Sequence, residues 1–157
     1  MSDPLVLYLD DHLAGAAAGL RLAERLARDD HRLDEVRRQI SEDRATLYAM
    51  LRRFGAGPSV VKPIGARIVE LASRVRLGRR SGPTGPVNLL LQLEALSMGI
   101  EGKRHLWRSL LEIVSIEPRL DAAELSELAG RADHQLLLVE ALRLSVAVAA
   151  LDHHSVD

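Results

Sequence analysis

Four polar residues stand where the sequence otherwise repeats apolar side chains every three or four positions. That spacing places residues on one face of an α-helix, so these polar side chains are expected to point into a helical core. Burial without partners would cost several kcal/mol for each group, and we therefore expect them to hydrogen-bond to one another. The four residues are His12, Asp43, Lys103 and Gln135.

Four charged residues lie near these positions in the sequence and could join the same layer. They are Glu94, Glu101, Glu140 and Arg143. Because the first four residues fall near the centres of the expected helices, the spacing predicts a charged, hydrogen-bonded layer across the middle of the core. This layer is also the candidate binding site. The alternative is a stripe rotated by about 100°, the turn of one residue, which would place one or more of these side chains on the surface.

The helices that must position this layer follow from the composition and the apolar stripes. Leu and Ala dominate, aromatic residues make up 3% of the chain, and runs of strand-forming residues are short, which favours an all-α fold. Short links indicate that the first two long helices form one antiparallel hairpin and the last two form another. The expected helices are residues 4–28, 31–54, 60–77, 86–114 and 121–152, the third being a short helix in the crossover between the hairpins.

The first expected helix offers two apolar stripes instead of one. The first stripe contains Leu9 and His12, and the second contains Leu9 and Leu13. Both pass through a stretch of Ala and Gly, small residues that let a neighbouring helix approach closely. Gly15 and Gly19 each cost about 1 kcal/mol in helix propensity, which indicates a packing role for them.

The crossover differs from the rest of the chain in charge. Residues 55–86 contain six basic side chains and one Glu, a net charge of +5, which leaves −6 for the remainder. A basic segment can bind phosphate backbones, but this one lacks interleaved aromatic residues, so nucleic acid is not favoured as a partner. A solvated helix face, or a contact with an acidic protein surface, explains the charge better.

Composition excludes several classes of protein. A chain of 157 residues is expected to form a single domain, residues 1–157, and its net charge of −1 indicates no general attraction to nucleic acid or membranes. The absence of cysteine excludes disulfides, thiolate metal sites and thiol catalysis. The first residues lack the basic start of a signal peptide, and no apolar run approaches the roughly 18–20 residues of a membrane span. We therefore expect a cytoplasmic protein.

Three segments resemble members of the ferritin-like superfamily, in particular a family of uncharacterised bacterial proteins. They read DHLAGAAAGLRLA (11–23), LEALSMGIEGKRHLW (93–107) and RADHQLLLVEALR (131–143). The resemblance covers nearly the whole chain. It implies a ferritin-like four-helix bundle of two antiparallel hairpins joined by a long crossover, and it implies no particular activity.

The ligand pattern of the metal-binding ferritin-like proteins is missing. Those proteins hold two iron or manganese ions with a Glu from each of two helices and a Glu-x-x-His from each of the others. The sequence contains no Glu-x-x-His, and Glu101 and His105 are spaced by four residues instead of three. Lys103 and Arg143 would repel a dication. We therefore predict no metal ligands and no cofactor, with Glu94 or Glu140 forming ion pairs to these cations instead.

Three functional hypotheses follow. The first is a non-enzymatic structural or interaction protein with a degenerate metal site, because neither a nucleophile elbow nor a phosphate-binding glycine loop is present. Its partner would be a second copy, since the segment LSVAVAAL (144–151) is apolar on more than one face and favours a homodimer. The second is a di-iron or di-manganese protein with irregular ligands: His12, Asp43, Glu94, Glu101 and Glu140. The third is a small-molecule-binding bundle that uses the polar layer as its pocket.

Overall fold

The structure, a computed structural model, describes residues 3–57 and 85–152, and every regular element in these ranges is helical. The prediction of an all-α chain is confirmed. The extra helix predicted at residues 60–77 lies outside the described residues. The described elements are α1 (Pro4–Asp29), the short 3-10 helix η1 (His31–Leu33), α2 (Asp34–Arg53), α4 (Pro86–Ile113) and α5 (Ala122–Leu151).

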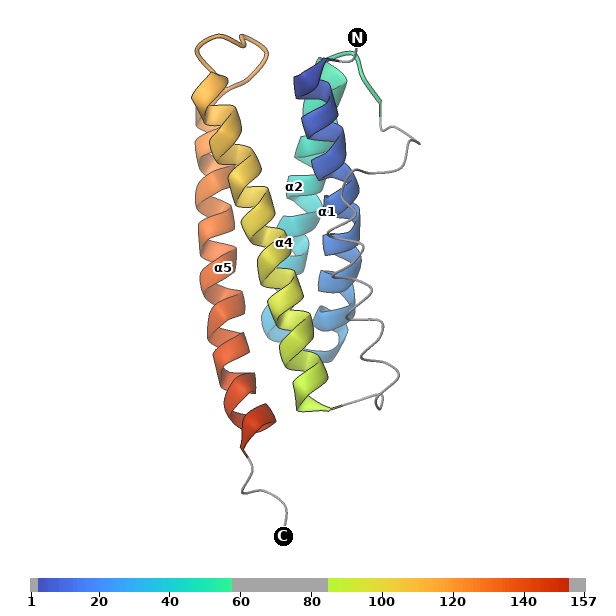
Figure 1. The fold of residues 1–157 in the computed structure, drawn as a ribbon, viewed down its shortest axis with the longest axis vertical. Coiled ribbons are helices and arrows are strands. Elements are labelled where there is room, and N and C mark those ends of the chain that lie inside the picture. The colour runs from blue at the N-terminus through green and yellow to red at the C-terminus, as the bar shows by residue number, and fades with distance from the viewer. Residues whose placement is uncertain (1–2, 58–84, 153–157) are drawn as a thin grey trace.

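The long helices form a bundle of two antiparallel pairs, α1 with α2 and α4 with α5 (Figure 1). Helix α1 also packs against α4, and α2 packs less extensively against α5. The hydroxyl of Tyr8 on α1 donates to Ser109 on α4 across 3.3 Å. Helix α2 ends at one end of the bundle and α4 begins at the other, as Figure 1 shows.

Local capping signals explain where the helices begin and end. The Asp3 carboxylate accepts the backbone N–H of Leu5 at 2.9 Å, next to a proline in the first turn of α1. Asp121 caps α5 in the same way, 2.8 Å from the Glu124 N–H. Gly55 ends α2 with a φ of 72°, a left-handed conformation that glycine adopts without a steric penalty.

The core lies along the bundle axis and is filled mainly by leucine. Trp107 is fully buried together with leucines from all four long helices, and the cluster includes Leu26 near the end of α1 and Leu125 near the start of α5. Among the described residues, the only buried polar or charged side chains are Asp43 and Gln135. Both belong to the layer predicted from the sequence.

Helix α5 is unusual among the described helices. It is long and apolar enough to cross a membrane, by length and composition alone, whereas no such segment was expected from the sequence. Only 17% of its most apolar 18-residue window is buried inside the bundle. A helix of this kind exposes apolar surface that the core of the bundle does not cover.

Candidate functional site

Asp43 is the centre of the polar layer. It lies on α2 between the core residues Ile40 and Leu47, and only 1% of its surface is exposed. A buried carboxylate is tolerated only when charged or polar partners replace the lost water. Helices α4 and α5 supply those partners.

Lys103 of α4 brings the first positive charge to Asp43. Its Nζ atom lies 2.5 Å from Oδ2 of Asp43 and 2.5 Å from Oε1 of Gln135. The Lys103 side chain is 14% exposed, so its ammonium is largely removed from water. Hydrogen bonds with a charged donor are stronger than those between neutral groups.

Arg131 of α5 brings a second positive charge to the other oxygen of the same carboxylate. Its Nη1 atom donates to Oδ1 of Asp43 across 3.0 Å. On its outer side Arg131 also meets Glu42 at 3.5 Å and Glu127 at 3.1 Å. The layer therefore connects outward to surface carboxylates that balance its charge.

Gln135 completes the layer from the fully buried side of α5. Its amide nitrogen donates to Oε1 of Gln39 at 3.0 Å and to Oδ2 of Asp43 at 3.2 Å, while its oxygen accepts from Lys103. One amide thus connects groups from α2 and α4. Three helices meet in this network, and each must be in register for the bonds to form.

Burial controls the protonation of the lysine. Removal from water lowers the pKa of the Lys103 ammonium from its ordinary value of 10.5, and repulsion from Arg131 adds to the lowering. Attraction to Asp43 opposes both effects, so the ion pair offsets only part of the cost of burial.

The structure does not bring all eight predicted residues together. Asp43, Lys103 and Gln135 form the layer, whereas four others lie near the surface, contrary to the sequence-based expectation. Each of these follows a buried residue (Leu93, Ile100, Val139 or Leu142) by one position, a turn of about 100° away from the core. The four residues are Glu94, Glu101, Glu140 and Arg143.

These surface residues form ion pairs of their own. Arg143 bonds to Glu140 at 2.7 Å and lies 3.6 Å from Glu94, so two of the pairings expected from the sequence are present, although outside the layer. Glu101 contacts Arg104 and lies 3.2 Å from the ring of His105. Neither cluster reaches Asp43.

His12 also lies apart from the layer. Of the two stripes on the first helix, the one through Leu13 is buried, so His12 is turned aside and remains half-buried. Its ring packs edge-on against Tyr8 with centroids 4.7 Å apart. Burial lowers the pKa of the His12 imidazole below 6.5 and His105 contributes to this, while Asp11 opposes it.

Two members of the layer were not predicted. Arg131 precedes Gln135 by four residues on α5, and Gln39 precedes Asp43 by four on α2. Residues four apart share a helix face, so a search of the positions one turn from each polar residue in a stripe would have found both.

The layer does not fit a di-metal centre. Across residues 3–57 and 85–152, no three His, Asp or Glu side chains lie close enough together to hold a metal ion. Two cations, Lys103 and Arg131, already occupy both oxygens of the buried carboxylate. A dication beside them would meet two positive charges and a single negative one.

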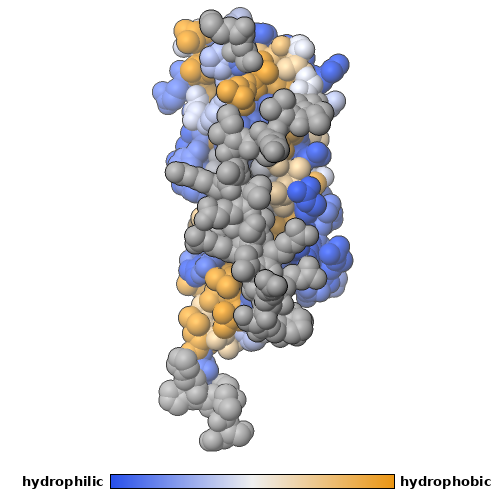
Figure 2. All heavy atoms as spheres, turned by 45° about the vertical axis from the view of Figure 1, so that its right-hand side comes forward, coloured by the Kyte–Doolittle hydropathy of each residue, from blue (hydrophilic) through white to orange (hydrophobic). Residues whose placement is uncertain are grey.

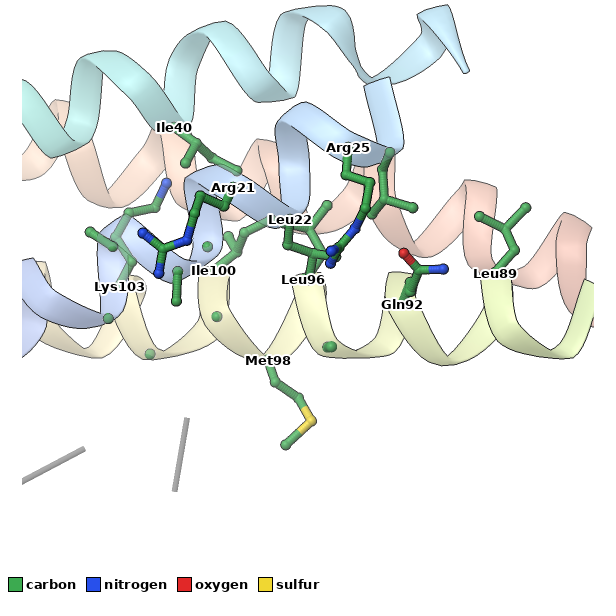
Figure 3. Close-up of a pocket in the computed structure, with 18 of the residues that line it drawn as sticks. Arg21, Leu22, Arg25, Ile40, Leu89, Gln92, Leu96, Met98, Ile100 and Lys103 are labelled. Atoms are coloured by element: carbon green, nitrogen blue, oxygen red, sulfur yellow. The ribbon is translucent and has the colours of Figure 1, made fainter. Parts of the chain in front are cut away.

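A cavity of about 1310 Å³ adjoins the layer between α1 and α4. Asp43 and Lys103 contribute to its wall, and Figure 3 shows Arg21 and Arg25 of α1 beside it. Small residues form much of the remaining surface. A Cβ atom added at Gly19, or at Gly99 or Gly102 on the opposite helix, would meet no described atom within 4 Å. The close helix contact expected at Gly19 is therefore absent from the described part of the chain.

Trp107, the single tryptophan of the chain, also lies against this cavity. Its side chain is fully buried, and its indole N–H has no hydrogen-bond partner among the described residues. Buried indole N–H groups normally find an acceptor.

Comparison of the chain with protein-family models, with curated proteins and with solved structures finds no match.

Proposed function

We propose that this chain is a ferritin-like bundle with a structural or interaction role, in which ion pairs stand in the position of a di-metal centre. The observation that supports the proposal most is the Lys103 ammonium, bonded to Asp43 and Gln135 at the middle of the bundle. A cation fixed there performs the electrostatic task that metal ions perform in the metal-binding relatives of this fold: it compensates a buried carboxylate.

In this proposal the layer selects one arrangement of the helices. A shift of α4 or α5 by one turn would separate Lys103 or Arg131 from Asp43 and leave charges buried without partners. Leaving one such charge uncompensated costs about 3–5 kcal/mol. An apolar layer would tolerate the same shift at much smaller cost, so the charges supply specificity of pairing more than stability.

Metal analysis tests this proposal. The chain is purified without a His tag after growth with added iron and manganese, and its metal content is measured by mass spectrometry. We expect far less than one ion per chain. A stoichiometric ion that disappears in the Asp43→Asn variant would overturn the proposal and favour a metal protein with irregular ligands.

The proposal includes a homodimer, a cytoplasmic location and no catalytic activity. No catalytic constellation is present among the residues that the structure describes, and the apolar outer surface of α5 fits a protein partner. Cell fractionation tests the location: recovery of the chain in the membrane fraction, resistant to a high-salt wash, would contradict it.

A small-molecule-binding bundle is the second candidate, favoured by the cavity and by the indole N–H of Trp107, which has no hydrogen-bond partner within residues 3–57 and 85–152. A ligand with one acceptor group and an apolar body would satisfy both features. Because Trp107 is the single tryptophan, its fluorescence reports directly on the cavity. Titration with decanoate should shift the emission if the candidate is right, and an unchanged spectrum at millimolar decanoate would count against this class of ligand.

A further inference from the structure

Helix α5 carries a second apolar stripe on its solvent side. Its members follow one another at intervals of four, three, four and three residues, which is the heptad spacing of helices that pack along their length. The four large side chains are 70%, 53%, 73% and 57% exposed, in chain order. The stripe consists of Leu137, Ala141, Leu144, Val148 and Leu151.

This outer stripe is distinct from the face of α5 that builds the core. The buried residues Gln135, Val139 and Leu142 belong to the inner face, and at about 100° per residue the outer stripe lies on the opposite side. Near the end of α5, Val87 and Leu91 of α4 are also half-exposed. Figure 2 shows hydrophobic residues gathered at this end of the molecule.

No charge interrupts the outer stripe. Between residues 136 and 151 the ionisable side chains are Glu140 and Arg143, which bond to each other at 2.7 Å. Arg143 also reaches Glu94, so this pair is turned toward α4. A second helix could therefore cover the stripe without burying an unpaired charge, which is the usual obstacle to such a contact.

We propose that a second copy of this chain packs its own α5 against this stripe in antiparallel orientation, with the two-fold axis beside Leu144. This inference rests on the homodimer proposed above and names its surface and register. Around that axis Leu144 meets its own counterpart, Leu137 meets the partner's Leu151, and Ala141 meets the partner's Val148. The interface is isologous and closed, as most homodimer interfaces are.

The antiparallel orientation follows from size and from charge. It sets the small Ala141 against a larger side chain, whereas a parallel pair would place Ala141 against Ala141 and leave a gap. A parallel pair would also align the first halves of both helices, which would bring the exposed Glu127 carboxylate of one copy opposite the partner's Glu127. In the antiparallel pair those halves point away from one another, and the two antiparallel helix dipoles attract each other.

Molar mass in solution tests the surface. Wild-type chain at micromolar concentration should have twice the monomer mass by light scattering, and the Leu144→Glu variant should be monomeric. Leu7→Glu is the matched control, because Leu7 is 49% exposed on α1, away from the stripe, and it should remain dimeric. A wild-type monomer would refute the homodimer itself. A dimer that survives Leu144→Glu would refute only the proposed interface.

Engineered cysteines test the register, since the native chain contains none. Under mild oxidation Leu144→Cys should cross-link to itself, because residues at a two-fold axis come within disulfide distance. Leu137→Cys and Leu151→Cys should each fail alone and cross-link when the two variants are mixed. Self-linkage of all three would show a parallel pair and overturn the antiparallel register. A monomer that sediments with phosphatidylcholine–phosphatidylglycerol vesicles would instead identify a lipid surface as the partner of the stripe.

Discussion

Helix α2 takes part in two ion-pair networks that differ chiefly in their contact with water. On its outer face Arg38 bonds to Glu35 and to Glu42, and all three side chains are about half exposed. On its inner face Asp43 bonds to Lys103 and Arg131 and is almost fully buried. Each network joins one central charge to two opposite charges. Glu42, which lies 3.5 Å from Arg131, connects the two networks, and the chief difference between their central charges is burial.

The pKa values show what burial changes. On the outside, hydrogen bonds from Arg38 and Gln39 lower the pKa of the Glu35 carboxyl to about 2. On the inside, the pKa of Lys103 is lowered, which disfavours its charged form even though Asp43 is in contact. The outer pair is favourable but dispensable, because water can replace either partner. In the inner pair each partner compensates a cost that would remain if the other were removed.

The largest expected effect comes from removing the central charge of the buried network. Asp43→Asn keeps the shape of the side chain and leaves Lys103 and Arg131 without their shared counter-ion. We expect the free energy of unfolding to fall by about 3–5 kcal/mol, measured by urea denaturation followed by circular dichroism. A loss below about 1 kcal/mol would show that the two networks do not differ as proposed.

The positions that form this centre could be predicted from the sequence because packing holds them there. Asp43, Lys103 and Gln135 occupy stripes whose other members are buried leucine, isoleucine and valine, so the helix cannot rotate them outward without exposing its core. The same apolar period predicted the all-α fold and helix limits close to those observed.

The surface residues could not be separated from the layer by the same pattern. Glu140 is one position beyond the buried Val139, a difference of about 100° around the helix. A sequence pattern does not resolve the direction of a side chain more finely than one residue. Neighbouring helices decide the outcome: Arg143 draws Glu140 and Glu94 into a surface cluster on the α4 side. The cavity beside α1 was beyond prediction too, because small residues are compatible with close contact and with open space alike.

A smaller loss is expected when one of the two buried cations is removed. In Lys103→Met, Asp43 keeps Arg131 and Gln135, so the carboxylate loses one charged hydrogen bond but remains compensated. We expect a loss of about 1.5–3 kcal/mol, measured by the same urea titration. An unchanged melting temperature would mean that Lys103 contributes nothing in the folded state. A loss equal to that of Asp43→Asn would mean that Arg131 does not compensate.

The alkaline pH dependence provides a subtler test of the buried lysine. Because its folded-state pKa lies below 10.5, the unfolded chain binds more protons than the folded chain between the two pKa values. The contribution of Lys103 to stability therefore rises with pH across that window and is flat below it. Urea titrations of wild type and Lys103→Met over this range should therefore diverge, because the wild type gains stability relative to the variant as the pH approaches 10.5. A difference that stays constant or narrows would contradict the lowered pKa.

The smallest effect belongs to the exposed network. Glu35→Gln removes a carboxylate that is held by strong hydrogen bonds yet surrounded by water, so we expect a loss of stability much smaller than that of either buried variant. Since the pKa of Glu35 is lowered to about 2, its contribution is present above its ordinary value of 4.5 and is lost as the pH falls toward 2. At neutral pH, 1 M salt should abolish the loss of stability caused by Glu35→Gln, because exposed charges are screened within about 3 Å at that ionic strength. The loss caused by Asp43→Asn should be mostly retained. If salt reduced the effects of both substitutions on stability to the same extent, water would reach Asp43 as freely as Glu35. Burial would then not explain the difference between the two faces of α2.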